Sequence, residues 1–105
     1  KTLWVAFQPH TYSRTKALLA DLAQSLTLAD KIILADIYAA REQDPGDISS
    51  ADIADLITKS GKEALYLGDF EKIEDFLKKN LDTGDLLITM GAGNIVEVGE
   101  SLIIH

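Results

Sequence analysis

The order of apolar segments constrains the fold of this chain more than any other feature. Short apolar runs of strand length alternate with longer stretches in which apolar side chains recur at the helical period. The strand-like runs cover residues 3–7, 32–35, 64–67 and 86–90. Such alternation is typical of β-α-β units, whose strands lie parallel in one sheet between layers of helices. The sequence therefore predicts an α/β fold.

Helix signals follow each strand-like run. The first helix is expected to begin near Ser13 and to end before Asp30. A second is expected to start at Ser49, which forms a capping box with Asp52, and to end at Gly61 as a left-handed C-cap; Asp69 caps the third. The side chains expected to face inward are Leu18, Leu19, Leu22, Ala23, Leu26; Ile53, Leu56, Ile57; Phe70, Ile73, Phe76, Leu77; and, in a last helix, Ile95, Val98, Leu102 and Ile103. We expect a Rossmann-like three-layer domain with a mainly parallel sheet and the order β-α-β-α-β-α-β-α.

Length and composition limit the class of protein. A chain of 105 residues forms one domain, so residues 1–105 are assigned to a single unit. The absence of cysteine excludes disulfides, thiolate catalysis and zinc sites of the cysteine type. No apolar run approaches the roughly 20 residues that span a bilayer, and a cytoplasmic location fits this composition. Because the chain opens directly on a strand-like run, we interpret it as a fragment of a longer protein.

The charge of the chain is acidic and unevenly placed. The net charge is −7; residues 1–44 hold five basic and five acidic side chains, whereas residues 45–105 hold five lysines and twelve acids. Such a chain lacks the basic surface that binds nucleic acid or an anionic membrane, so neither is expected as a partner. An anionic ligand must be bound locally, and the two arginines, Arg14 and Arg41, are the candidates.

Three polar loops are expected to meet at one edge of the sheet. Residues 8–15, 36–49 and 91–94 each follow the carboxyl end of a strand-like run. Right-handed crossovers place these ends at the same edge, where open α/β sheets bind ligands. Residues 36–49 form the longest connection, and a loop of that length in a small domain is more often functional than accidental.

The loop after the first strand holds two candidate ligand-binding side chains. His10, the only internal histidine, could bond to a substrate or transfer a proton, and otherwise it is an exposed loop residue. Arg14 lies just inside the helix start, where a cation opposes the helix dipole, so we favour a functional role over a surface pairing with an aspartate. No second histidine or carboxylate lies at ligand spacing from His10, so no metal site is expected.

The other two loops allow both functional and structural interpretations. Tyr38 and Arg41 could contact a ligand; alternatively, Tyr38 anchors its loop against the sheet and Arg41 pairs with Glu42. The segment Gly91-Ala92-Gly93-Asn94 could present backbone amides to an anion, with Gly91, Gly93 and Asn94 as contacts, or could allow close packing of strand and helix. It lacks the third glycine of a dinucleotide fingerprint and the Gly-Lys-Ser/Thr of a P-loop.

Three segments, in order, resemble the C-terminal domain of the Mur ligases. They are Phe7-Gln8-Pro9-His10-Thr11-Tyr12-Ser13-Arg14-Thr15, then Asp36-Ile37-Tyr38-Ala39-Ala40-Arg41-Glu42, then Met90-Gly91-Ala92-Gly93-Asn94-Ile95. The first is specific, the second is moderately so, and the third is weak by itself. Together they span nearly the whole chain, and they are most similar to the branch of the family that adds L-alanine to UDP-N-acetylmuramate.

The resemblance implies part of an ATP-dependent enzyme of peptidoglycan synthesis that forms an amide bond through an acyl phosphate. The family has three domains: the first binds the UDP-sugar, the central one binds ATP and Mg²⁺, and the third closes over it. By this resemblance Arg14 contacts the alanine carboxylate or a nearby phosphate, and His10 orients the amino acid. Thr11, Tyr12 and Ser13 would shape the pocket, and no residue here is implied to be catalytic.

The chain departs from the family pattern in two respects. It begins after the strand and helix that open the family's third domain with an Asp-Tyr-x-His-His-Pro type segment, and it has no P-loop. By itself the chain is therefore expected to catalyse no reaction and to bind no cofactor. Its expected partners are the missing N-terminal and central domains. At the position of Thr11 some family members carry a second arginine. Two alternatives stay open: a ligase that recycles murein peptides, and a non-catalytic module that binds phosphate or a nucleotide sugar.

Overall fold

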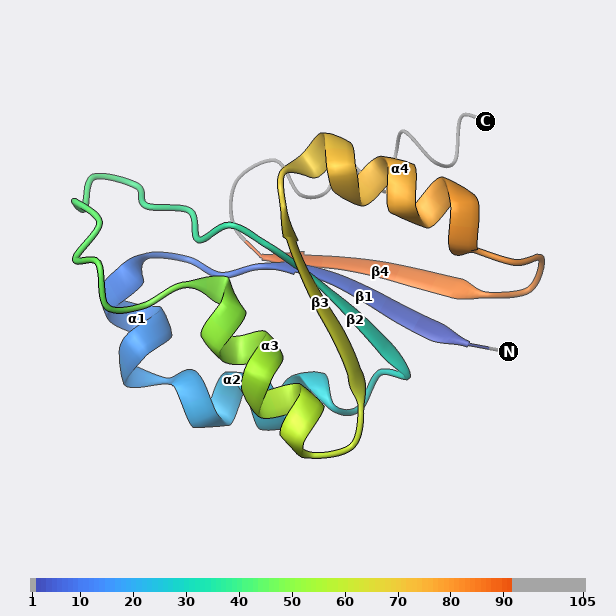
Figure 1. Ribbon diagram of the computed structural model, residues 1–105, viewed down its shortest axis with the longest axis horizontal. Coiled ribbons are helices and arrows are strands. Elements are labelled where there is room, and N and C mark those ends of the chain that lie inside the picture. The colour runs from blue at the N-terminus through green and yellow to red at the C-terminus, as the bar shows by residue number, and fades with distance from the viewer. Residues whose placement is uncertain (1, 92–105) are drawn as a thin grey trace.

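The computed structural model describes residues 2–91, and these form a parallel sheet between two layers of helices (Figure 1). The strands are β1 (Leu3–Gln8), β2 (Lys31–Ala35), β3 (Glu63–Gly68) and β4 (Leu86–Gly91). The helices are α1 (Tyr12–Ala17), α2 (Leu19–Leu26), α3 (Ser50–Lys59) and α4 (Phe70–Asn80). The predicted α/β fold is confirmed, while the last predicted helix, with Ile95, Val98, Leu102 and Ile103, lies outside the described residues. Among the helices described, none is long and apolar enough to cross a membrane.

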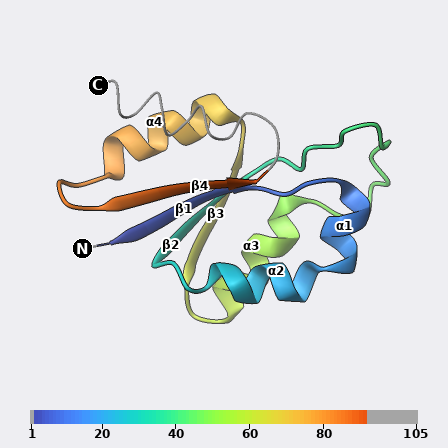
Figure 2. The ribbon, with the colours of Figure 1, turned by 180° about the vertical axis from the view of Figure 1, so that it is seen from behind.

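The order of strands in the sheet is β3-β2-β1-β4, and all neighbours are parallel. The chain moves outward from β1 to β3 and then crosses back to place β4 on the other side of β1. Right-handed crossovers in opposite directions put their helices on opposite faces of a sheet. Accordingly, α1, α2 and α3 cover one face and α4 covers the other (Figures 1 and 2).

Two apolar cores lie on the two faces of the sheet, because successive residues of β1 and β2 point to opposite sides. Trp4 of β1 is only 3% exposed. The core beneath α2 and α3 contains Val5, Ala23, Leu26, Ala29, Ile32, Leu34, Ile53, Ala54 and Ile57. The core beneath α4 contains Trp4, Ala6, Ile33, Ala35, Ile73 and Leu77. Burial on both faces explains why these strands read as continuous apolar runs.

The predicted helix caps are confirmed. Ser49 and Asp52 form a capping box at the start of α3, in which the backbone N–H of Ser49 donates to the Asp52 carboxylate over 2.9 Å. Gly61 follows α3 with a φ of 98°, which is the left-handed conformation that glycine adopts readily. Asp69 caps α4 by accepting a 2.7 Å hydrogen bond from the backbone of Glu71.

The prediction of one continuous helix from Ser13 to the residues before Asp30 is wrong, because two helices cover this stretch. The helix bends at Leu18, whose φ of −110° and ψ of 17° separate α1 from α2. The hydrogen bonds from Leu18 to Arg14 (2.9 Å) and from Leu22 to Leu18 (2.8 Å) continue across the bend. A regular apolar stripe assumes a straight axis, and the bend leaves Leu18 47% exposed instead of buried.

Leu56 is a second exception to the predicted inner faces. It is 37% exposed, whereas Ile53, Ala54 and Ile57 of the same helix are buried. Leu56 instead lines a shallow groove together with Ala20, Ala23, Gln24, Thr27 and Ser60. The buried stripe of α3 is therefore narrower than the apolar pattern predicts.

The carboxylate of Asp85 joins the start of β4 to the start of β1. It accepts hydrogen bonds from the backbone of Asp82 (3.0 Å) and of Thr2 (3.2 Å) and from the indole Nε1 of Trp4 (3.1 Å). These bonds, the one from Asp82 first, favour the ionised carboxylate and hold the pKa of Asp85 below its ordinary value of 3.8. The contact therefore depends on the charge of Asp85.

Acid is expected to weaken this contact. A carboxyl group whose pKa is lower in the folded state than in the unfolded state contributes stability above its unfolded pKa, and the contribution disappears as the pH falls through the folded value. For Asp85 this window lies below 3.8. Unfolding of the chain, followed by the fluorescence of its single tryptophan Trp4, should be more acid-sensitive in the wild type than in Asp85→Asn. An exposed aspartate on α3, substituted as Asp55→Asn, is the control; equal acid sensitivity of all three proteins would contradict the assignment.

Candidate ligand-binding site

Two of the predicted loops are fastened together at the carboxyl edge of the sheet. The backbone N–H of Tyr38 donates to the carbonyl of Pro9 over 2.8 Å, and that of Thr11 donates to the carbonyl of Tyr38, also over 2.8 Å. The rings of His10 and Tyr38 stack with centroids 5.7 Å apart and planes inclined by 19°. Tyr38 is 43% exposed, so it holds the first loop through its backbone and its ring instead of burying against the sheet.

The third predicted loop is described only at its first residue. Gly91 ends β4 beside Gln8 of β1, with a φ of 122°. A Cβ atom at this position would lie 2.1 Å from the carbonyl oxygen of Gln8. Close packing of β4 against β1 therefore accounts for Gly91. Gly93 and Asn94 lie outside the described residues.

The start of α1 is capped by residues from both loops. Thr11, at a φ of 62°, is the N-cap, and its hydroxyl accepts a 3.3 Å hydrogen bond from the backbone of Arg14. Glu42 accepts hydrogen bonds from the backbone N–H groups of Tyr12 (2.7 Å) and Ser13 (3.1 Å), and from the hydroxyl of Ser13. The bond from the Ser13 hydroxyl is the main cause that lowers the pKa of Glu42 below its ordinary value of 4.5.

This arrangement corrects one structural interpretation of the long loop. The sequence allows an ion pair between Arg41 and Glu42, but within residues 2–91 the ion pairs join Lys16 to Asp47 and Lys31 to Glu63. The carboxylate of Glu42 instead binds α1. Its role was missed by sequence reasoning, and one signal for it was available, because the first turn of α1 contains no acidic residue.

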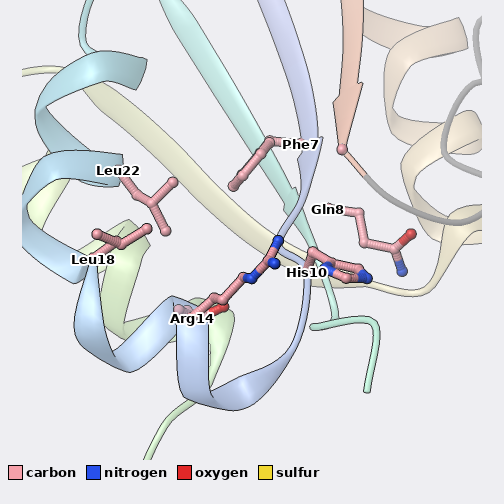
Figure 3. A pocket seen from close by; sticks show the side chains of 8 residues that line it. Phe7, Gln8, His10, Arg14, Leu18 and Leu22 are labelled. Atoms are coloured by element: carbon pink, nitrogen blue, oxygen red, sulfur yellow. The ribbon is translucent and has the colours of Figure 1, made fainter. Parts of the chain in front are cut away.

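Arg14 and His10 line one cavity of about 440 Å³ on the side of α1 that faces β1 and α2 (Figure 3). Figure 3 shows the guanidinium of Arg14 reaching from α1 toward the end of β1, where His10 lies. Phe7, Leu18 and Leu22 form an apolar wall of the same cavity. Arg14 is exposed and takes part in no ion pair within residues 2–91. The cavity thus combines an available guanidinium, an imidazole and an apolar wall.

The remaining candidate residues do not all share this cavity. Tyr12 and Ser13 line a second hollow, of about 420 Å³, on the other side of α1; its other lining residues are Lys16, Glu42, Gln43, Pro45 and Asp47. Arg41 is exposed on the long loop. The structure therefore places His10, Arg14 and Gly91 at the first cavity and Tyr12 and Ser13 at the second hollow, while Thr11, Tyr38 and Arg41 line neither.

Gln8 and Asp36 add polar groups that the pattern did not single out as site residues. Gln8 is 8% exposed; its Nε2 donates to the carbonyl of Asp36 over 3.2 Å, and its Oε1 has no hydrogen-bond partner among the described residues. The hydroxyl of Tyr66 donates to the carboxylate of Asp36, and this bond raises the pKa of Tyr66 to about 12. The carboxylate of Asp36 is thus hydrogen-bonded to a residue of β3 at the carboxyl edge of the sheet. In residues 2–91 no three metal-ligating side chains form a cluster.

The fold and the site define an α/β domain that gathers polar loops at the carboxyl edge of a parallel sheet, with the unpaired Arg14 in a cavity there. A family model described as "Mur ligase, glutamate ligase domain" matches residues 1–93. The chain belongs to the Mur ligase family, and the predicted resemblance is confirmed.

Three similar curated proteins carry the same enzyme name. The chain is 60% identical to the UDP-N-acetylmuramate–L-alanine ligase of Lachnoclostridium phytofermentans over 103 residues, which are 98% of this chain and 22% of that protein. It is 59% identical to the protein of the same name from Caldanaerobacter subterraneus subsp. tengcongensis, again over 98% of this chain and 22% of the relative. It is 52% identical to that of Acetivibrio thermocellus, over 93% of this chain and 21% of the relative. The chain thus spans about a fifth of the length of these relatives.

Proposed function

We propose that this chain is the C-terminal domain of an ATP-dependent ligase that joins L-alanine to UDP-N-acetylmuramate in peptidoglycan synthesis. The observation that carries this proposal is the guanidinium of Arg14, unpaired within residues 2–91, in a cavity with an apolar wall. The names of the similar proteins supply the substrates, since each is called a UDP-N-acetylmuramate–L-alanine ligase.

Arg14 is the residue that we assign to the carboxylate of the amino acid. A guanidinium presents a planar fork of donors that matches a carboxylate, and such charge-assisted bonds fix both position and direction. Held in this way, alanine would direct its amine at the activated carboxyl carbon, which is an orientation effect. The apolar wall of Phe7, Leu18 and Leu22 suits a small apolar side chain. His10 would help to orient the amino acid.

The other substrates would be held mainly by the parts of the parent protein beyond this domain. ATP would supply the phosphoryl group that converts the muramate carboxylate into an acyl phosphate. The alanine amine then attacks the acyl carbon, and the tetrahedral intermediate expels phosphate. Mg²⁺ would be held together with ATP, mainly by the central domain that the family resemblance implies. We expect the domain alone to be inactive, and the full enzyme to act in the cytoplasm.

Phosphate release by the full-length parent protein tests this function. The assay contains ATP, Mg²⁺ and UDP-N-acetylmuramate, with either L-alanine or a murein tripeptide as the amine. We expect release that saturates with alanine and stays at background with the tripeptide. Release that depends on the tripeptide alone would identify a recycling ligase, and no release with either amine would indicate a binding module.

A further inference from the structure

The carboxylate of Glu42 completes the N-terminal cap of a helix that lies about thirty residues earlier in the chain. Three successive backbone N–H groups begin α1, and all three are satisfied: Tyr12 and Ser13 by Glu42, and Arg14 by the hydroxyl of Thr11. Since α1 has only six residues, it is too short to be stable alone, and its geometry depends on these contacts. A carboxylate at this end also has the sign that the helix dipole favours.

The long loop holds Glu42 in place by its own backbone. The N–H of Glu42 donates to the carbonyl of Ala39 over 3.0 Å, and Ala40 between them has a φ of 56°. This tight turn follows directly on Tyr38, which bonds to both sides of His10 through its backbone. An ion pair between Lys16 and Asp47 makes a separate connection between the same helix and the same loop. Glu42 is therefore one defined contact among several.

The contact between Glu42 and α1 affects the ligand-binding cavity because Arg14 belongs to the same helical turn. The N–H groups that Glu42 engages belong to the two residues immediately before Arg14, whose side chain enters the cavity of about 440 Å³. With those N–H groups occupied by Glu42, the guanidinium of Arg14 is the permanently charged donor among the residues that line the cavity. Without the carboxylate of Glu42, the first turn of α1 could change direction, and the backbone N–H groups of Tyr12 and Ser13 would lose their acceptor.

We propose that Glu42 is a positioning residue for amino-acid binding, which fixes the first turn of α1 and thereby aims Arg14 at the carboxylate of the substrate. The inference rests on the proposed function. Glu42 is placed in the second hollow, on the other side of α1 from the cavity, so it acts through the helix and does not touch the amino acid.

The test uses the full-length parent protein with Glu42→Ala, Glu42→Gln and a control, Asp47→Asn. The control removes the charge that pairs with Lys16, in the same loop and against the same helix. For each protein we would measure kcat, the KM values for alanine, ATP and UDP-N-acetylmuramate, and the thermal midpoint. Glu42→Ala should raise the KM for alanine by about tenfold or more, because small misplacements of an orienting group are costly. The other two KM values should stay within about twofold of wild type.

Glu42→Gln provides the conservative rescue, since its amide oxygen can accept the same backbone N–H bonds. We expect its KM for alanine to be within about threefold of wild type, and that of Asp47→Asn to be within about twofold. If Glu42→Ala does not fold, Glu42→Asp takes its place, because the shorter side chain draws the carboxylate away from the N–H groups and should raise the same KM selectively.

Three results would overturn the inference. They are an unchanged KM for alanine in the Glu42 variant, an equal rise of all three KM values, and an equal effect in Asp47→Asn, which would point to loop attachment in general. In each of these cases the wild type still releases phosphate in response to alanine, so the proposed function survives. A wild-type parent without alanine-dependent release overturns both proposals.

Discussion

Replacing Arg14 by alanine in the full-length parent protein should lower kcat/KM for L-alanine by about thirtyfold or more, which corresponds to about 2 kcal/mol of transition-state binding. The reason is that the variant loses a charge-assisted contact and leaves the carboxylate of the substrate without its donor. In the described part of the chain, Arg14 forms no ion pair that would compete for the guanidinium. Initial rates of phosphate release at varied alanine concentration measure the effect.

Two further variants make this result specific. Arg14→Lys keeps the charge but not the planar fork, so we expect it to recover only part of the loss. Lys59→Ala also removes one positive charge, but it lies in the last turn of α3, away from the carboxyl edge, and should behave as wild type. If Arg14→Ala and Lys59→Ala give the same kcat/KM as wild type, Arg14 is a surface residue and the assignment of the carboxylate site is wrong.

Replacing Gly91 by alanine should cost about 3 kcal/mol of folding stability, more than the same change at Gly46, Gly61 or Gly68. The added Cβ would lie 2.1 Å from the carbonyl oxygen of Gln8 and 2.9 Å from its carbonyl carbon and its nitrogen. The φ of 122° is also unfavourable for any residue with a Cβ. The end of β4 would have to separate from β1. Denaturant unfolding of the chain measures the change in the free energy of unfolding.

Gly46 offers a matched control for the steric part of this effect. It also has a positive φ, of 79°, but a Cβ there would meet nothing within 4 Å. Gly46→Ala should therefore cost only the backbone strain, about 1 kcal/mol. Equal losses in the free energy of unfolding for the two variants would mean that backbone strain alone explains the effect at Gly91. The close approach of β4 to β1 would then add no cost.

Much of the fold follows from local patterns. The continuous apolar runs of β1 and β2 predict strands buried on both faces, and the cap residues Ser49, Gly61 and Asp69 mark the ends of helices as expected. The bend at Leu18 could not be predicted, since both halves of the helix continue the same apolar period across it. The order of strands also has no local signal, because it depends on the direction in which each crossover passes over the sheet.

The candidate site was predictable in its location and less so in its internal contacts. The parallel arrangement alone indicates that His10 and Arg14 lie at the carboxyl edge, and the structure places both in one cavity. Glu42 was missed because its partners lie about thirty residues away in the sequence. The direction of its side chain also depends on the left-handed backbone of Ala40, which cannot be predicted from an alanine. The buried amide of Gln8 was missed because it reads as part of the polar loop.

The most direct test of the central claim is to identify the product made by the full-length parent protein. The protein is incubated with ATP, Mg²⁺, UDP-N-acetylmuramate and L-alanine, and the nucleotide sugars are separated and analysed by mass spectrometry. We expect a new species in which alanine has condensed with UDP-N-acetylmuramate with loss of water, and we expect this species to be absent when either alanine or ATP is omitted. A folded parent protein that forms no such species under these conditions would show that it is not an L-alanine ligase.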